Sequence, residues 1–576
     1  MEINYRKIKP LNLESLVKQY DQTEEDKEFD YNPFSVSQMQ AFNPLYTDFF
    51  VLNESNFNRV GLNTKNYLDS DRIYPSLLNY HVKCSPLLDP VHYLVGKYAS
   101  DPYQQLRTLP GLTPNDCHPK IANKQNASYV DGFFCYLSSQ MLHKYNMLNA
   151  IDFYGSFLCV QNQFKANITD DVDYLNGSSH FLENLGKQFS ISCVKGGEFD
   201  DFTGIGSRAN KKRLVLGEDD LSPDDLAVEE LFATDVLREV PEDPESIPVC
   251  EYEKSSKDPA DNYSEEDGDE EEELNYSSEE EEAGSSDKSI DKSLASDQSL
   301  ASDESLASDE SLESDQSLEE EAFIYVHDFP ANLIFLEKCD GTLDQLFMNK
   351  EIDEKKGAAC LMQVVMSLIA LQKVFHLTHN DLHTNNIMYK NTDVEFLYYK
   401  YNNKFYQVPT YGRIFKIIDF GRAIYRFKNK RYCSDSFAPK GDAHSQYNTE
   451  PYFNAKKARI EPNLSFDLCR LGTSIYDFVI QDEREPRDEF QETVFRWCQD
   501  DNGKNVMYKK NGEERYPGFK LYKMIAKNVH AHCPQDQLKY AFFDQFYVDP
   551  IDASKLDESI VRQYGLNIDF LEKEYF

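Results

Sequence analysis

The spacing of apolar side chains predicts helices in two stretches of this chain and strands in several others. Residues 129–142 and 353–375 repeat apolar positions every three to four residues, as amphipathic helices do. Runs rich in aromatic and branched side chains favour strands at residues 92–98, 151–160, 323–326, 332–337, 394–400, 405–408 and 413–418. This mixture predicts the α+β fold class.

The periodic pattern stops between residues 241 and 321, where the sequence is acidic and of low complexity. Residues 251–321 contain 28 acidic and 4 basic side chains, so they carry −24 of the formal charge of −40. A hexamer of the type SLASDQ repeats from Ser293 to Gln316. Because such a segment buries too little apolar surface to offset chain entropy, we expect a long disordered acidic insertion. It is a solvated spacer, a phosphorylatable segment or an electrostatic decoy for basic partners.

Outside this insertion the chain is only mildly acidic, which argues against a nucleic-acid-binding surface. The 12 cysteines form no CxxC pairs, so we expect reduced, buried thiols and a cytosolic protein. Residues 1–15 contain no apolar run, and the apolar stretch 360–375 is interrupted by polar side chains. The sequence therefore predicts neither secretion nor a membrane span.

The candidate chemistry begins in the loop HNDLHTNN, residues His379–Asn386. It places one carboxylate, Asp381, five positions before one carboxamide, Asn386. A loop that orients a hydroxyl nucleophile and also holds a cation bound to phosphate oxygens needs such a pair of groups.

Two later motifs extend this chemistry. The sequence IIDFG ends an apolar strand with Asp419, and we expect Gly421 to take a positive φ angle that aims this carboxylate at a metal. Asp467 begins a helical stretch in which Gly472 follows five positions later. Each motif is weak alone, but the three in this order are hard to obtain by chance.

The ordered set HxDxxxxN, DFG and DxxxxG resembles the eukaryotic protein kinase-like fold, from about residue 85 to residue 576. The strings THNDLHTNNIMY, RIFKIIDFGRAIY, EPNLSFDLCRLG and ERYPGFKLYKMIA look similar to Ser/Thr protein kinase-like proteins of giant nucleocytoplasmic large DNA viruses. This resemblance implies a bilobal fold with an antiparallel-sheet small lobe and a mainly helical large lobe. It also implies transfer of phosphate from ATP, with Mg²⁺ or Mn²⁺, to Ser or Thr of protein substrates in the host cytoplasm or the virion. No nucleic acid or membrane partner is expected, and the oligomeric state stays open.

The resemblance also implies roles for single residues. Asp381 matches the catalytic base, while Asn386 and Asp419 match metal ligands. Glu337, at the end of a predicted strand, is expected to contact the nucleotide. The residues expected to act as structural anchors are His379, Gly421 and Asp467.

A lysine that binds the nucleotide phosphates is expected nearer the N-terminus, paired with an acid on a helix. Lys97 and Asp131 fit this order of strand, helix and strand, although a lysine on a strand edge is often only a surface residue. A competing pair combines a lysine at 211–212 with a glutamate at 229–230. The sequence contains no complete GxGxxG motif.

Two positions depart from the family pattern. Asn380 stands where many kinases have an arginine that reads a phosphate on the activation loop. His383 stands where Ser/Thr kinases usually have a lysine that contacts the transferred phosphate. The 38 positions from Asp381 to Asp419 exceed the family's usual hairpin, and the extra tyrosine-rich strands account for them.

A zinc site is a weaker alternative. His379 and His383 have the HxxxH spacing, but metalloprotease helices need Glu directly after the first histidine and this chain has Asn380. The histidines and cysteine at 530–533 have no second cluster at ligand spacing.

Three functions therefore remain: a protein kinase, a pseudokinase or docking module of the same fold, and a kinase that acts on a small molecule. The expected parts are an N-terminal extension (1–84), the small lobe (85–240 and 322–337), the acidic insertion (241–321) and the large lobe (338–576).

Overall fold

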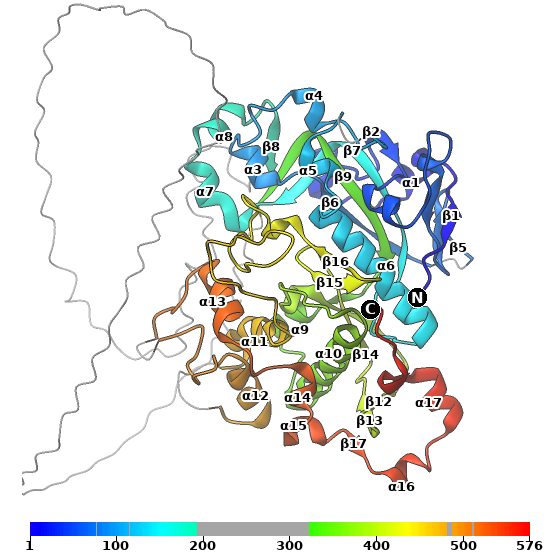
Figure 1. Ribbon diagram of the computed structural model, residues 1–576, viewed down its shortest axis with the longest axis vertical. Helices are drawn as coiled ribbons and strands as arrows, with labels where there is room; N and C mark the ends of the chain where they lie inside the picture. Colours follow the sequence, from blue (N-terminus) through cyan, green and yellow to red (C-terminus); the bar gives the residue numbers. More distant parts are fainter. Residues whose placement is uncertain (76–77, 114–115, 193–321, 481–485, 510–511, 576) are drawn as a thin grey trace, which may run out of the picture. The chain divides into compact units, whose positions relative to one another are not determined.

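The computed structural model describes residues 1–75, 78–113, 116–192, 322–480, 486–509 and 512–575. The chain divides into two units, Met1–Lys212 with Leu318–Phe576, and Arg213–Ser317. All described residues belong to the first unit. This unit mixes α-helices with several antiparallel sheets (Figure 1).

The largest sheet has the strand order β2-β7-β9-β6, and β8 pairs with part of β9. All its pairs are antiparallel. The strands are β2 (Val36–Gln40), β6 (Tyr80–Pro86), β7 (Phe153–Asn167), β8 (Phe189–Ser192) and β9 (Phe323–Glu337). The predictions of strands at 323–326 and 332–337 are corrected to one strand, because β7 pairs with β9 along its whole length.

The N-terminal residues are part of this structure. Strand β2 lies at one edge of the sheet and β6 at the other. Because β6 spans Tyr80–Pro86, the expected boundary between residues 84 and 85 falls inside this strand. Leu16, Phe34 and Leu45 are buried in the main hydrophobic core. The remaining N-terminal elements are β1 (Tyr5–Lys7), α1 (Leu13–Gln19), α2 (Glu24–Glu28), β3 (Val60–Leu62), β4 (Tyr67–Asp69) and β5 (Arg72–Tyr74).

The chain leaves β8 and re-enters β9 at paired positions. Ser192 lies opposite Phe323, and the Phe323 N–H donates to Ser192 Oγ at 3.3 Å. Residues 193–321 between them lie outside the described residues, as do the competing lysines at 211–212 and the glutamates at 229–230.

Helix α6 (Ala127–Tyr145) confirms the helix predicted at residues 129–142, and it packs against β7 and β9. The Asn126 side chain caps its start by accepting the Ser128 N–H at 3.0 Å. Asn146 ends it in the left-handed conformation with φ of 59°. Figure 1 shows α6 beside the sheet, on the side that faces the C-terminal helices.

The strand predicted at residues 92–98 is wrong. Asp89 accepts the His92 N–H at 2.9 Å, and Pro90 occupies the first turn of helix α3 (Pro90–Leu94). An aspartate cap followed by proline favours a helix start, so a short helix forms and Lys97 lies in the turn after it. The other short helices before β8 are α4 (Tyr103–Leu106), α5 (Pro119–Ala122), α7 (Val172–Asn176) and α8 (Ser179–Asn184).

Helix α10 (Glu354–Phe375) runs through the C-terminal part of the core. Asp353 caps its first turn, and His376 ends it in the left-handed conformation. Among the described residues α10 is the helix with the length and apolar composition of a membrane span, but 94% of its apolar window is buried in the protein. It contacts β13, β14 and three helices, and this packing is typical of a core helix of a globular domain.

Two small sheets and several helices surround α10 (Figure 1). The first sheet consists of β10 (Gly341–Thr342), β11 (Ile387–Asn391) and β14 (Arg413–Ile417). The second consists of β17 (Tyr547–Val548), β13 (Lys404–Pro409), β12 (Phe396–Tyr401) and β18 (Gly565–Asn567). β15 (Ile424–Phe427) and β16 (Lys430–Cys433) form a hairpin. The helices are α9 (Leu343–Met348), α11 (Phe466–Val479), α12 (Glu489–Trp497), α13 (Lys520–Asn528), α14 (Pro534–Gln537), α15 (Ala541–Asp544), α16 (Pro550–Ala553) and α17 (Glu558–Tyr564).

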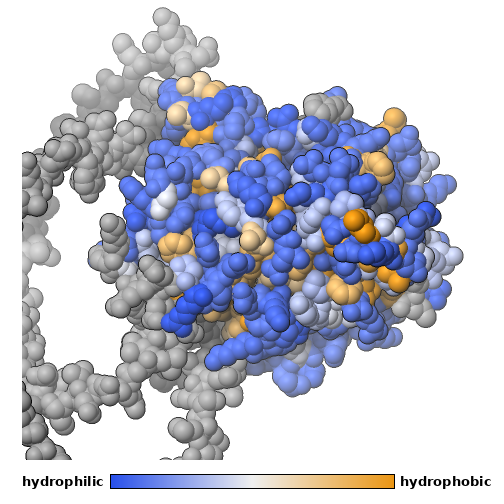
Figure 2. Space-filling view, turned by 90° about the horizontal axis from the view of Figure 1, so that it is seen from below, coloured by the Kyte–Doolittle hydropathy of each residue, from blue (hydrophilic) through white to orange (hydrophobic). Residues whose placement is uncertain are grey.

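β12 and β13 form an antiparallel hairpin, where the sequence predicts two strands at residues 394–400 and 405–408. Asn402 and Asn403 both have positive φ angles, of 52° and 60°, as a two-residue turn between twisted strands requires. On the face shown in Figure 2, hydrophobic residues lie in small groups among hydrophilic ones. Most of the large apolar side chains are instead gathered in one continuous core.

Candidate functional site

Asp467 holds the backbone of the loop His379–Asn386. It lies at the start of α11, and its two carboxylate oxygens accept the His379 N–H at 3.1 and 2.9 Å. One of them also accepts the Asn380 N–H at 2.9 Å. Burial raises the pKa of Asp467, whereas His379 and these backbone donors act in the opposite direction. Two N–H groups that make three hydrogen bonds to one buried carboxylate fix the first turn of the loop.

His379 connects this loop to the strand before Asp419. Its Nε2 donates to the Ile418 carbonyl at 2.9 Å, and its Nδ1 accepts the Asp381 N–H at 3.3 Å. Its ring lies 5.3 Å from that of Phe420, between centroids. His379 therefore packs the loop against the segment that carries Asp419.

Asn380 is buried and uses all its polar side-chain atoms inside the protein. Its Nδ2 donates to the carbonyls of Thr378 and Arg422, at 3.2 and 2.9 Å, and its Oδ1 accepts the Tyr447 hydroxyl at 2.8 Å. Its φ of 66° lies in the left-handed region, which asparagine tolerates better than most residues. The Asn380 side chain thus stabilises the loop through buried hydrogen bonds.

Asp381 is partly exposed, and its carboxylate has two neighbours. Oδ1 accepts the hydroxyl of Tyr522, from α13, at 2.8 Å, and Oδ2 lies 3.7 Å from Arg422 Nη1. Burial would raise the pKa of Asp381, but Arg422, Arg470, His383 and the Tyr522 hydroxyl together lower it. The group therefore remains an ionised carboxylate, the form that can accept a hydrogen bond from a substrate hydroxyl.

Asn386 ends the loop beside the strand of Asp419. Its backbone carbonyl accepts the Ile418 N–H at 3.0 Å. Its side-chain Nδ2 donates to the Asp381 carbonyl at 2.9 Å and to His383 Nε2 at 3.1 Å. These bonds fix the amide, and no described residue donates to its Oδ1.

Asp419 follows β14 in a left-handed conformation, with φ of 63°. The predicted positive φ therefore belongs to Asp419 and not to Gly421, which corrects the expected role of this glycine. A Cβ atom on Gly421 would lie 3.3 Å from Asp419 Oδ1, where the Gly421 N–H now donates. Gly421 thus provides room for the carboxylate.

The lysine that meets this acid is Lys83, on β6. Its Nζ lies 2.6 Å from Asp131 Oδ2 and 2.8 Å from Asp419 Oδ1. Burial would lower the pKa of Lys83, but the two carboxylates raise it. Burial would raise the pKa of Asp419, and Lys83 instead lowers it to about 2. Lys83, Asp131 and Asp419 therefore form a charged triad.

The pair Lys97–Asp131 does not form, and this prediction is corrected. Asp131, as predicted, meets a lysine, but its Oδ2 is bound by Lys83 while its Oδ1 accepts the Phe420 N–H at 2.9 Å. Lys97 lies in the turn after α3 and not on a strand, because that segment is helical. The signal for Lys83 is the alternating stretch YHVKCS, residues 80–85, which ends at a proline.

Glu337 is used inside the protein. Its Oε1 lies 2.7 Å from Lys416 Nζ and accepts the Asp152 N–H at 2.9 Å. Lys416 is buried and also donates to the carbonyls of Leu148 and Ala150, at 2.9 and 2.7 Å. These bonds occupy the Glu337 carboxylate, so its side chain is not available for the expected contact with the nucleotide.

Asp419 and Asn386 offer oxygen atoms of the kind that Mg²⁺ prefers. Asn386 Oδ1 and Asp419 Oδ2 accept no hydrogen bond from a described residue. The described part of the chain contains no group of three or more His, Cys, Asp or Glu that could hold a metal. A cation bound here would take its other ligands from phosphate oxygens and water, so the donor set fits a nucleotide-bound cation.

The histidines considered for zinc have other partners. His530 pairs with Asp501 at 2.6 Å, and His532 Nε2 bonds the Gln499 carbonyl at 2.8 Å. His383 bonds Asn386, and burial lowers the pKa of His383 to about 4 although Asp381 acts against this.

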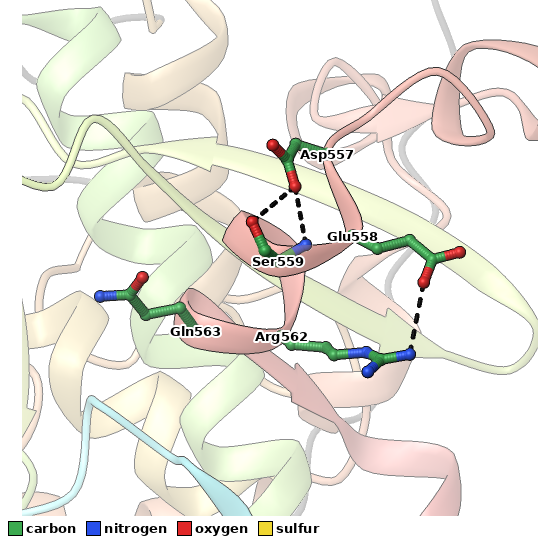
Figure 3. A pocket seen from close by; sticks show the side chains of 5 residues that line it. All are labelled: Asp557, Glu558, Ser559, Arg562 and Gln563. Carbon is green, nitrogen blue, oxygen red and sulfur yellow. Dashed lines mark hydrogen bonds and ion pairs between the residues drawn. The ribbon is translucent and has the colours of Figure 1, made fainter.

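A hollow of about 670 Å³ lies away from these residues, on α17 (Figure 3). Its side chains bond one another, since Asp557 accepts from Ser559 and Glu558 pairs with Arg562 at 3.3 Å. A second hollow, of about 270 Å³, is lined by residues of the N-terminal segment and of α6. None of the residues predicted for the site lines either hollow.

No protein-family model matches this chain. Over 88 residues, 15% of its length, the chain is 33% identical to the serine/threonine-protein kinase haspin of Bos taurus. The matched stretch spans about 11% of that relative's length. The similarity is therefore kinase-like and partial.

Proposed function

We propose that this chain is an ATP-dependent Ser/Thr protein kinase with a bilobal kinase fold. The observation that carries the proposal is the convergence of Lys83, Asp131 and Asp419 with the loop that bears Asp381 and Asn386. The antiparallel sheet with α6 corresponds to the small lobe, and the helices around α10 to the large lobe. The partial similarity to a kinase supports the same assignment.

In this proposal Lys83 binds phosphate oxygens of ATP, and Asp131 holds its ammonium group in place. Asp419 and Asn386 hold a divalent cation, which supplies positive charge to the phosphates when it is bound. Asp467 and His379 keep the loop in position, so the reacting groups do not have to be ordered in each cycle.

Asp381 orients the acceptor hydroxyl by accepting its hydrogen bond. Burial would raise the pKa of Asp381, but Arg422 contributes most among the groups that lower it, and the lowered pKa keeps the carboxylate ionised at neutral pH. A lowered pKa makes the carboxylate a weaker base, so its contribution is mainly to position the oxygen that attacks the γ-phosphorus.

Protein acceptors as partners, a giant-virus origin and a location in the host cytoplasm or virion belong to the same proposal. They rest on the resemblance of the motif strings alone.

The test uses purified full-length protein, labelled ATP, Mg²⁺ and generic protein acceptors. Asp381→Asn and Asp419→Asn should each lower labelling by about 100-fold or more, because each removes a group at the reacting centre. Asp393→Asn is the matched control, since Asp393 is an exposed aspartate in the loop before β12. Equal labelling by all four proteins would contradict the proposal.

A second function, a docking module that binds nucleotide without transfer, is favoured by one observation: Tyr522 already occupies an oxygen of Asp381. It predicts a rise in Tm with Mg-ATP and no labelling of any acceptor. Labelling of a free metabolite, with none of protein, would instead identify a small-molecule kinase.

A further inference from the structure

Arg422 is held between two carboxylates at the edge of the candidate site. Its Nη1 lies 3.7 Å from Asp381 Oδ2, and its Nη2 donates to Asp442 Oδ2 at 2.6 Å. It follows Asp419 by three positions, and its guanidinium lies 5.6 Å from the centre of the Tyr522 ring. About 25% of the side chain is exposed, so a ligand bound beside Asp381 can reach it.

A phosphoryl group in transfer carries its negative charge on three outer oxygen atoms. Positive groups fixed beside it stabilise this charge most strongly where water is excluded. The site therefore needs a cation on the side of Asp381, in addition to the charges beside Asp419.

The other described cations near the site do not lie within ion-pair distance of Asp381. Lys83 is bound by Asp131 and Asp419. Arg470 donates through Nε to the Tyr522 hydroxyl at 2.9 Å. In the described chain, Arg422 is the one lysine or arginine within ion-pair distance of Asp381.

His383 uses one of its ring nitrogens inside the loop. Its Nε2 lies 3.1 Å from Asn386 Nδ2, which is a donor, so this histidine nitrogen accepts. In the observed arrangement this nitrogen therefore offers no N–H to a phosphoryl group.

We infer that Arg422 binds the phosphoryl group during transfer and supplies the positive charge beside Asp381. The inference rests on the proposed function. A guanidinium stays protonated and presents several N–H donors, so one edge can bind two phosphoryl oxygens while Asp442 retains the other. The 3.7 Å separation from Asp381 is too long for a strong hydrogen bond, and Nη1 can turn to the phosphoryl group without breaking one.

The acceptor oxygen forms a bond to the γ-phosphorus, and the bond from that phosphorus to the bridging oxygen breaks with its electron pair remaining on ADP. The hydroxyl proton passes to Asp381 and then to water. Arg422 neither gains nor loses a proton.

The experiment compares full-length wild type with Arg422→Gln and Arg426→Gln, at saturating Mg-ATP and acceptor. Arg426 is an exposed arginine on β15 and serves as the matched control. We expect Arg422→Gln to lower kcat by about 100-fold while KM for ATP changes little, because Lys83 and Asp419 remain. Arg426→Gln should match wild type. A kcat for Arg422→Gln within twofold of wild type would overturn the inference.

Rescue variants distinguish binding of the phosphoryl group from a purely structural role, in which Arg422 acts only through its bond to Asp442. Adding His383→Lys to Arg422→Gln places a cation back beside Asp381 and should recover at least tenfold in kcat, although the Asp442 contact stays broken. If kcat of Arg422→Gln instead recovers on adding Asp442→Asn, and does not recover on adding His383→Lys, the role of Arg422 is structural and the inference is overturned.

If Arg422→Gln gives no cooperative melt, Arg422→Lys replaces it. This variant keeps the charge and loses the fork of donors, so kcat should fall about tenfold. An unchanged kcat would overturn the inference. Absence of transfer by wild type would overturn the proposed function and the inference with it, whereas an active wild type with an equally active Arg422→Gln overturns the inference alone.

Discussion

Lys83 of β6 and Asp131 of α6 lie 48 positions apart in the chain and 2.6 Å apart in space, between Nζ and Oδ2. Asp131 also accepts the backbone N–H of Phe420, so one carboxylate binds the lysine of the sheet and the segment that carries Asp419. A displacement of α6 would therefore disturb the ammonium group and Asp419 together.

Lys83→Met and Lys97→Met form a matched pair of substitutions. We expect Lys83→Met to lower phosphoryl transfer by about 100-fold or more and to remove the rise in Tm with Mg-ATP, because Asp131 and Asp419 lose their shared cation. Lys97→Met should behave as wild type. Thermal melts with and without Mg-ATP, beside the transfer assay, measure both effects. A larger loss of phosphoryl transfer in Lys97→Met than in Lys83→Met would favour Lys97, the lysine predicted from the sequence, as the residue that binds the phosphates.

Asp467→Ala should destabilise the protein by about 3 kcal/mol, because three backbone bonds from two buried N–H groups lose their acceptor. Urea unfolding of wild type and of Asp467→Ala measures the difference in the free energy of unfolding. Asp393→Ala, at an exposed position, should change it by less than about 0.5 kcal/mol. A difference of similar size in both variants would contradict the role of Asp467 as the anchor of the loop.

Tyr522→Phe removes the hydroxyl that bonds Asp381 Oδ1. This bond is one of the interactions that lower the pKa of Asp381, so its loss raises that pKa. Because the ionised carboxylate is the active form, the acid limb of the profile of kcat/KM against pH should move to higher pH. Tyr411→Phe, at an exposed tyrosine, is the control and should leave the limb in place. An unmoved limb in Tyr522→Phe would show that another group controls it.

Lys416→Met should lower the free energy of unfolding by about 3 kcal/mol. The substitution leaves the largely buried carboxylate of Glu337 without its cation. Lys390→Met, which breaks an exposed pair with Asp340, should cost less than about 1 kcal/mol. The double variant Lys416→Met with Glu337→Gln should recover part of the loss, and a further decrease would contradict the pairing.

The loop residues could be placed from sequence because their constraints are local. His379–Asn386 follows a long periodic helix, and Asp419 ends a short apolar strand, so each motif lies at the end of an element with a clear pattern. Asp467 could be found in the same way, at the first turn of α11. The loop is bonded both to Asp467 and to Ile418, the residue before Asp419.

Lys83 could not be placed in the same way. Its strand is fixed by pairing with β9, which lies beyond residues 193–321, and local alternation does not reveal so distant a partner. The stretch around Lys97 has the same aromatic and branched composition as a strand, and only the Asp89–Pro90 start signal distinguishes it. Likewise, the hydrogen bond of Tyr522 and the ion pair of Arg422 with Asp381 join segments whose approach depends on the tertiary fold.

Ser192, at the end of β8, pairs with Phe323, at the start of β9. Since both ends of the intervening segment leave the sheet at one point, added or deleted SLASDQ-type hexamers need not alter the register of β8 and β9. For the disordered insertion that the sequence predicts, a doubling of length would cost only about 0.6 kcal/mol of closure entropy. Selection on the fold is therefore nearly blind to hexamer number, and related genes are expected to differ in length at this position before they differ elsewhere.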